Sequence, residues 1–205
     1  MPSEVQGILF DLGGVVIDWN PRHLYRNVFG DDATRMEFFL TNICSTEWNE
    51  LQDAGRALSE ATESRVREYP EWEPEIRAYY GRWREMIAGE ISGTDELLGE
   101  LSRMRIRLFA LSNWSLETFP LISGQFRVLE KFERIFLSGE AHAAKPDRRF
   151  YEFALERIDI PKSRLLFVDD NLRNVEAARG LSLSAIHFHD ASQLRRDLRA
   201  FELYL

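Results

Sequence analysis

Five short apolar runs are spaced along the chain, and none shows the clean alternation of a half-exposed strand. Runs that are apolar throughout are typical of parallel strands that are buried on both faces. They are rich in Ile, Leu, Val and Phe and cover residues 7–10, 105–111, 134–137, 165–168 and 184–188. Because helical patterns separate the last four runs, the order of elements predicts a doubly wound α/β sheet.

The helices between these runs should begin and end at recognisable residues. Thr94 is the expected cap of a helix whose apolar face spans residues 97–104. Pro146 is expected at the first position of the next helix, where its missing N–H costs nothing. Residues 174–179 fit a short helix that Gly180 closes.

The stretch from Asp18 to Gly89 has a different pattern. It offers several helical segments and no convincing strand, and its last helix is expected to extend through residues 76–87. A helical insertion directly after the first strand predicts a cap over the edge of the sheet. The sequence therefore divides into an α/β core of residues 1–17 and 90–205 and a helical cap of residues 18–89.

Acidic residues end two of the predicted strands. Asp11 follows the first run, and Asp169 and Asp170 follow the fourth. The carboxyl ends of parallel strands meet at one edge, where open α/β sheets bind ligands, so these carboxylates should lie together. Clustered carboxylates need a cation or a proton between them, and hard oxygen ligands favour Mg²⁺, usually shared with a substrate phosphate. The pattern therefore points to phosphate chemistry.

Other chemically useful groups follow the same strands. Ser112 and Asn113 end the second run, and Lys145 precedes the helix after the third. Phosphoryl transfer needs a nucleophile, a metal ion, a cation and donors around the phosphoryl oxygens. With an ordinary pKa of about 3.9, Asp11 would be ionised at neutral pH and could attack phosphorus without a base. Glycines 13 and 14 would let the backbone approach a phosphate or expose a carbonyl to a metal ion.

Four motifs in this order resemble those of the haloacid dehalogenase (HAD)-like hydrolases. They are Asp11-Leu12-Gly13-Gly14-Val15-Val16, Ser112-Asn113, Lys145-Pro146 and Val168-Asp169-Asp170-Asn171. The resemblance covers nearly the whole chain, and the helical insert looks like the C1 cap of that superfamily. It implies a Rossmann-like core, Mg²⁺ as cofactor and a small-molecule phosphate ester as substrate.

The resemblance also implies roles for individual residues. Asp11 would form an aspartyl-phosphate, and Ser112 with Asn113 would bind the phosphoryl oxygens. Lys145 would neutralise charge on Asp11 and on the phosphate. The implied Mg²⁺ ligands are Asp170 with Asp169 beside it, Asp11 and the Gly13 carbonyl, and Asn174 falls where the family often keeps a supporting polar residue.

The chain departs from the family pattern at Gly13. Family phosphatases usually carry there a second aspartate that protonates the leaving group, a role typically worth about 10²–10⁴-fold. Three explanations remain open: a leaving group that needs no help, such as a sugar 1-phosphate or an acyl phosphate; a substitute acid, for which Asp18 and His23 are the nearest candidates; or weak or lost activity. The Asp-Leu-Gly form of the motif resembles the branch of sugar-phosphate phosphatases, so a sugar phosphate is the expected substrate.

Two alternatives to a phosphatase remain open. A 2-haloacid dehalogenase would use Asp11 to attack carbon without a metal ion, but dehalogenases tend to replace the acids of the fourth motif, and Asp169 with Asp170 would then be a costly unneutralised pair. A degenerate, non-catalytic phosphate-binding protein would also explain the glycine at position 13.

Several other polar and aromatic residues carry weaker expectations. In the cap, Trp48 and Arg56 are candidates for substrate contact, and a structural role is the alternative for each. His142 stands where relatives often have glycine and is expected to be an exposed loop residue. His187 and His189, near the fifth strand, are expected to be structural.

Composition narrows the function classes. The 205 residues carry a formal charge of −8, which disfavours binding to nucleic acid or to an anionic membrane. No apolar run approaches roughly 18 residues, so neither a transmembrane helix nor a signal peptide is expected. The single cysteine, Cys44, excludes an intrachain disulfide and suits a reducing compartment. We expect a cytoplasmic monomer or homodimer.

Overall fold

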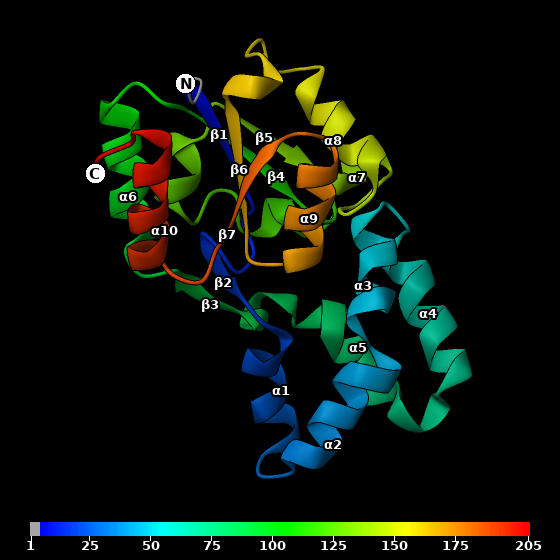
Figure 1. Ribbon diagram of the computed structural model, residues 1–205. Helices are drawn as coiled ribbons and strands as arrows, with labels where there is room; N and C mark the ends of the chain where they lie inside the picture. The colour runs from blue at the N-terminus through cyan, green and yellow to red at the C-terminus, as the bar shows by residue number, and fades with distance from the viewer. Residues whose placement is uncertain (1–4) are drawn as a thin grey trace.

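A parallel sheet with helices on both faces forms the larger part of the computed structural model, which describes residues 5–205 (Figure 1). The strand order is β5-β4-β1-β6-β7, and every neighbouring pair is parallel. The strands are β1 (Gly7–Phe10), β4 (Arg107–Ser112), β5 (Arg134–Leu137), β6 (Leu165–Asp169) and β7 (Ser184–His187). The central position of β1, between β4 and β6, confirms the predicted doubly wound α/β fold.

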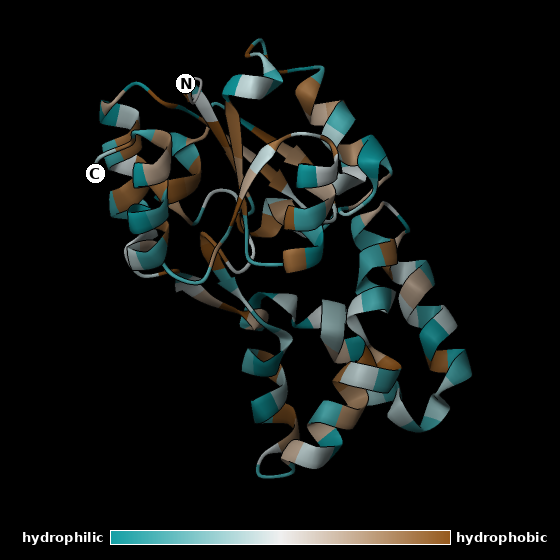
Figure 2. Cartoon of the chain, in the orientation of Figure 1, coloured by the Kyte–Doolittle hydropathy of each residue, from teal (hydrophilic) through white to brown (hydrophobic). Residues whose placement is uncertain are grey.

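Both faces of the sheet are buried because successive strand residues point to opposite sides. Ile8 and Phe10 belong to a cluster that includes α6 (Thr94–Arg103) and α10 (Ala191–Leu198). Leu9 belongs to the opposite cluster, with α8 (Arg148–Leu155) and α9 (Leu172–Gly180). Figure 2 shows apolar strands between helices whose outer surfaces are largely hydrophilic. Burial on both faces explains why the strands lack alternation.

The predicted helix starts differ from those observed. Thr94 is the first residue of α6 rather than its cap, which is Gly93, and its hydroxyl donates to the Val15 carbonyl at 3.0 Å. The peptide bond between Lys145 and Pro146 is cis, and α8 begins only at Arg148 with Asp147 as its cap. Helix α9 begins at Leu172, after Asn171, and includes Gly180 as its last residue.

The connection from β4 to β5 also differs from the prediction, which placed a helical pattern between these strands. It contains two 3₁₀ turns, Phe119–Leu121 and Arg127–Lys131. A short helix, α7 (Ser138–Ala141), follows β5 directly. The observed second strand of the sheet part, β4, begins at Arg107, two residues after its expected start.

A helical part lies beside the carboxyl edge of the sheet (Figure 1). Its helices are α1 (Pro21–Phe29), α2 (Ala33–Phe38), α3 (Thr46–Asp53), α4 (Leu58–Glu68) and α5 (Glu73–Gly81), with a π-helical turn at Phe39–Ile43 and 3₁₀ turns at Pro70–Trp72 and Trp83–Met86. Two short strands, β2 (Ile17–Trp19) and β3 (Ile87–Glu90), pair antiparallel where the chain leaves the sheet part and returns to it. The expectation of no strand within residues 18–89, and of a helix through residue 87, is therefore wrong.

Aromatic side chains form much of the core of the helical part. The ring centroids of Tyr25 and Phe39 are 4.8 Å apart, and those of Trp48 and Tyr79 are 5.2 Å apart. Trp48 itself is buried. A small bundle closes its core with large side chains, so packing accounts for the position of Trp48.

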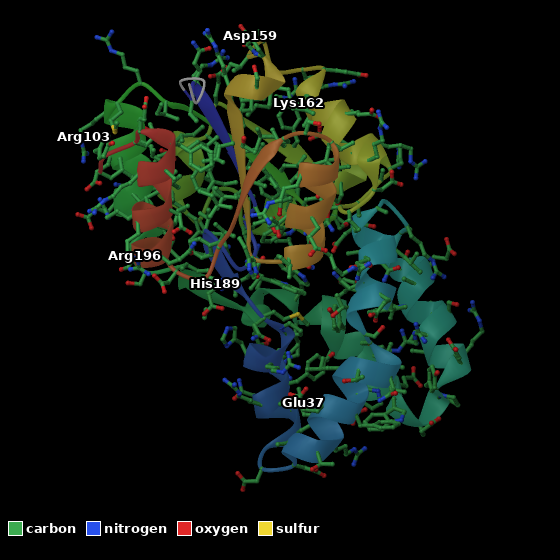
Figure 3. The ribbon with its side chains drawn as sticks, viewed as in Figure 1. Glu37, Arg103, Asp159, Lys162, His189 and Arg196 are labelled. Carbon is green, nitrogen blue, oxygen red and sulfur yellow. The ribbon has the colours of Figure 1, made fainter. Side chains whose placement is uncertain are left out.

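The surface carries charges of both signs. The labelled side chains Glu37, Arg103, Asp159, Lys162 and Arg196 lie on the periphery of different elements in Figure 3. Within residues 5–205, no helix has the length and apolar character needed to cross a bilayer.

Candidate active site

Three carboxylates meet at the carboxyl edge of the sheet. Asp11 follows β1 and Asp169 ends β6, and these two strands are neighbours. Carboxylate oxygens of Asp11, Asp169 and Asp170 all lie within 4.8 Å of one another. The strand order thus brings together acids that are more than 150 residues apart in sequence, as the sequence pattern predicts.

Lys145 lies between two of these acids. Its Nζ is 3.0 Å from Asp11 Oδ2 and 2.7 Å from Asp169 Oδ2, and its side chain has no exposed surface. The Asn113 side chain holds the backbone of Lys145 in place. Asn113 Nδ2 donates to the Lys145 carbonyl at 2.9 Å, and Asn113 Oδ1 accepts from the Lys145 N–H at 2.7 Å. The side chain of Asn113 is thus largely committed to positioning Lys145.

The remaining oxygens of the acids are also held. Asp11 Oδ1 accepts hydrogen bonds from the Ser112 hydroxyl at 2.8 Å and from the Leu12 amide at 2.7 Å. The Asn174 amide lies 3.1 Å from both carboxylate oxygens of Asp169, which the family resemblance anticipates for that residue. Asp11 is fixed in orientation, and Asp169 has its hydrogen-bonding capacity largely used by Lys145 and Asn174.

Asp170 is exposed, and the backbone of Gly14 lies directly against it. Gly14 has φ +79°, and a Cβ at this position would lie 2.2 Å from Asp170 Oδ2. Only glycine allows this approach, which explains the residue type at position 14. His187 Nε2 lies 2.8 Å from the Asp170 carbonyl oxygen, a structural contact that fits its expected role.

Burial and mutual repulsion shift the acids away from their ordinary behaviour. Burial raises the pKa of Asp11 to about 7 against the pull of Lys145, and Asp169 and Asp170 add to the rise. The expectation of an ordinary pKa for Asp11 is therefore wrong for the protein without a cation. Burial lowers the pKa of Lys145, but Asp11 and Asp169 outweigh it and raise the pKa above its usual value. Lys145 is thus charged.

The charge balance of the cluster fits a divalent cation. Three carboxylates face a single ammonium, so the ionised cluster carries an excess of two negative charges. Carboxylate oxygens are the hard ligands that Mg²⁺ prefers. Asn174 and Lys145 engage both oxygens of Asp169. Asp170 is exposed and Asp11 Oδ2 contacts Lys145, so Asp170 and Asp11 are the carboxylates best able to bind the cation.

A cavity of about 40 Å³ adjoins the cluster between the sheet part and the helical part. Gly13, two residues after Asp11, and Asn113, which binds the Lys145 backbone, are the lining residues next to the cluster. The other lining residues are aromatic or polar: Trp19, Asn49, Asp53, Tyr80, Trp83, Trp114 and Thr118. The buried indole N–H groups of Trp19 and Trp114 have no hydrogen-bond partner among residues 5–205.

Other residues singled out in the sequence lie away from this cavity. Trp48 packs inside the helical part, and Arg56 pairs with Glu60 at 3.2 Å on its surface. Asp18 and His23 pair with each other, His23 Nε2 lying 3.0 Å from Asp18 Oδ1. The cavity lining supports none of the four as a substrate contact or an acid.

His142 is exposed with φ 49°, as expected for a loop residue at the end of α7. Its ring lies against the helical part, where a Cβ on Gly55 would be 2.8 Å from Nδ1.

The sequence interpretation missed five cavity residues within residues 18–89: Trp19, Asn49, Asp53, Tyr80 and Trp83. One signal was present for Asp53, which is the last residue of α3. An acid at the carboxyl end of a helix is disfavoured by the helix dipole, so its presence there calls for another reason.

Comparison with known proteins places this chain among hydrolases. The haloacid dehalogenase-like hydrolase family matches residues 5–181. The chain is 26% identical over 199 residues to the drimenol cyclase drtB of Aspergillus calidoustus, covering 95% of this chain but only 36% of that protein. It is 25% identical to the sesquiterpene phosphatase astK of Aspergillus oryzae, with 97% of each chain covered.

Solved structures share the fold. A HAD family enzyme of Bacteroides thetaiotaomicron, in complex with magnesium and inorganic phosphate, matches with a TM-score of 0.67 at 22% identity. The match covers 93% of this chain and 98% of that one. At this identity the likeness shows a common fold.

Proposed function

This chain belongs to the haloacid dehalogenase-like hydrolases and is an enzyme of that family, and we propose from that premise that it is a Mg²⁺-dependent phosphatase of small phosphate monoesters. The observation that carries the proposal is the cluster of Asp11, Asp169 and Asp170 around the buried Lys145. A full-length relative named as a phosphatase supports the same reaction class.

Asp11 is the nucleophile in this proposal. The Ser112 hydroxyl and the Leu12 amide hold its Oδ1, so the orientation of the carboxylate is fixed before substrate binds. Such preorganisation lowers the barrier because the reacting groups need not be reordered during the reaction. Attack on phosphorus gives an aspartyl-phosphate, which water then hydrolyses.

Lys145 serves the phosphoryl group, and Ser112 serves the nucleophile. Lys145 carries a positive charge beside Asp11, which reduces the repulsion between the carboxylate and an incoming phosphate dianion. The one hydroxyl proton of Ser112 is donated to Asp11, so Ser112 acts by orienting the nucleophile, while Asn113 acts by holding the backbone of Lys145. Asp11, Asp170, Asp169 and the Gly13 carbonyl would hold Mg²⁺, which would neutralise charge on the phosphate.

The helical part, residues 18–89, is proposed to be a cap that contacts the leaving group. Its side of the cavity combines aromatic faces with the polar side chains of Asn49 and Asp53. The branch resemblance favours a sugar phosphate, whose ring can stack on the aromatic residues that line the cavity. Isoprenyl phosphates are the ester class to compare, because astK is named as a sesquiterpene phosphatase.

The 2-haloacid dehalogenase alternative fits the site poorly. That reaction needs a carboxylate nucleophile without a metal ion, and here Asp170 would remain beside Asp11 and Asp169 with one lysine for three acids. Uncompensated like charges at this distance are costly.

The test is phosphate release from p-nitrophenyl phosphate, hexose phosphates and isoprenyl phosphates, each with Mg²⁺ and with EDTA. We expect release only with Mg²⁺ and none from the Asp11→Asn variant. No release from any ester, with folded protein and bound Mg²⁺, would refute the phosphatase. Chloride release from a 2-haloacid would instead support the dehalogenase.

A further inference from the structure

The site lacks an aspartate at position 13 to protonate the leaving group, although there is room for a side chain at that position. A Cβ on Gly13 would meet nothing within 4 Å, and Gly13 forms part of the cavity wall. A carboxyl group projecting from position 13 would therefore enter the same cavity that Asp53 lines from the helical part.

Asp53 is held in the cavity by a chain of hydrogen bonds. Asn49 Nδ2 donates to Asp53 Oδ2 at 2.7 Å, and Tyr80 OH donates to Asn49 Oδ1 at 2.9 Å. All three side chains line the cavity. This arrangement orients the carboxyl, to which the Ser115 backbone N–H is a further donor.

The backbone around Asp53 is fixed to the sheet part independently of its side chain. The Ser138 hydroxyl, at the start of α7, donates to the Asp53 carbonyl at 2.6 Å and accepts from the Trp114 amide at 2.9 Å. Two residues later, Gly55 packs against the His142 ring. The end of α3 is thus attached next to the strand end that bears Ser112 and Asn113.

The environment of Asp53 favours the protonated form. Burial raises its pKa well above the usual value, and the charges of Glu50 and Asp11 raise it further, while the Ser115 amide lowers it. Its place at the carboxyl end of α3 adds the negative end of the helix dipole. A pKa raised above the usual carboxyl range is the direction of shift that suits an acid catalyst.

We propose that Asp53, supplied by the helical part and oriented by Asn49 and Tyr80, is the acid–base catalyst that replaces the aspartate missing at Gly13. The proposal rests on the phosphatase function. It names a residue from outside the four motifs, on an element that the family resemblance does not assign to proton transfer.

The reaction proceeds in two steps. An Asp11 oxygen bonds to phosphorus while the bond from phosphorus to the ester oxygen breaks, and the proton of the Asp53 carboxyl passes to that oxygen, which leaves as an alcohol. Water then attacks phosphorus and gives a proton to the Asp53 carboxylate as the bond from phosphorus to Asp11 breaks. Asp11 regains its electron pair, inorganic phosphate leaves, and Asp53 is protonated again.

The two acids suggested by the sequence are worse placed. Asp18 and His23 form a pair with each other, and neither lines the cavity. Asp53 is the carboxyl-bearing residue among the lining residues that the structure describes.

The test compares para-substituted phenyl phosphates, which differ in leaving-group basicity but little in shape. The measured quantity is kcat/KM, which reports the steps up to transfer to Asp11 and excludes the later hydrolysis. In the Asp53→Asn variant we expect a loss of about 100-fold or more for the most basic leaving group and less than about tenfold for p-nitrophenol, which leaves without a proton. Glu47→Gln, an exposed acid on the same helix, is the matched control.

A second variant tests whether a carboxyl at position 13 restores the lost activity. Adding Gly13→Asp to Asp53→Asn returns a carboxyl to the cavity, and we expect it to regain at least about tenfold in kcat/KM for the basic leaving groups. A residue that only stabilises the fold would lose activity equally for all leaving groups and would not be rescued.

Equal losses of kcat/KM for all phenyl phosphates in Asp53→Asn, or no loss, would overturn the role of Asp53. Phosphate release that depends on Mg²⁺ and on Asp11 would still support the phosphatase. No release from the wild-type protein would overturn both. Should Asp53→Asn not fold, the wild-type series decides: a kcat/KM nearly independent of leaving-group basicity supports an internal acid, and a steep dependence overturns it.

Discussion

Replacing Gly14 by alanine tests whether the contact between this backbone and Asp170 positions the metal site. The added Cβ would lie 2.2 Å from Asp170 Oδ2 and 2.7 Å from its Cγ, whereas ordinary contacts begin at 3.4 Å. The Asp170 carboxylate must therefore move by about 1 Å or more. Since Asp170 adjoins Asp11 and Asp169 in the acid cluster, this movement displaces one of the proposed Mg²⁺ ligands.

Two separate costs follow from the substitution. Alanine at φ +79° costs roughly 1–2 kcal/mol in folding free energy, because its Cβ crowds the following carbonyl. Displacing Asp170 should weaken Mg²⁺ binding by about 10–100-fold, the range found when the support of a metal ligand is lost. The first cost is independent of Mg²⁺, and the second is not.

Gly93→Ala is the matched control, because Gly93 has the same φ of +79° and its added Cβ would contact only Ala191 Cβ, at 3.1 Å. The assay is thermal unfolding in EDTA and at increasing Mg²⁺, with calorimetric titration of Mg²⁺. Both variants should melt lower in EDTA, and only Gly14→Ala should lose most of its stabilisation by Mg²⁺. If the two variants bind Mg²⁺ equally well, the reasoning about Asp170 is wrong.

Three further outcomes follow from the site. Lys145→Met leaves Asp11 and Asp169 unpaired, so urea unfolding should show a loss of about 3–5 kcal/mol, with the exposed Lys162→Met as control. Asn113→Ala removes both partners of the Lys145 backbone, and the same assay should show a loss of about 1–3 kcal/mol. Because the pKa of Asp11 is raised from 3.8 to about 7, the folded protein without metal keeps a proton that the unfolded chain has lost. Its stability in EDTA should therefore fall as pH rises from about 4 to about 7, and Asp11→Asn should remove this fall; a pH-independent difference between wild type and variant would contradict it.

The sheet could be predicted from the sequence because its signal is local. Strands such as β1 and β6 are apolar throughout, since both faces are covered by helices. The helix starts could not be predicted in the same way. The Thr94 hydroxyl is expected to cap its own helix, but it donates instead to the Val15 carbonyl, 79 residues away. Contacts of that range leave no trace in a local pattern.

The acid cluster was predictable for a similar reason. Asp11, Asp169 and Lys145 all follow strands of one parallel sheet, so the order of elements brings them together before any side-chain contact is known. Residues of the helical part lack such a constraint. Trp48 and Trp83 cannot be told apart by the sequence pattern, yet Trp48 packs inside the helical part and Trp83 lines the cavity.

Placing the acid on the helical part makes proton transfer depend on the contact between the two parts of the chain. An aspartate at position 13 would stand beside the nucleophile whatever the helical part did. The end of α3 that bears Asp53 contacts the sheet part through the Ser138 hydroxyl on the Asp53 carbonyl and through Gly55 against His142. Weakening that contact should therefore slow esters with basic leaving groups and spare activated ones, so Ser138→Ala should reproduce the leaving-group selectivity of Asp53→Asn in milder form. A uniform loss of kcat/KM across the phenyl phosphates in Ser138→Ala would show that the contact serves the fold alone.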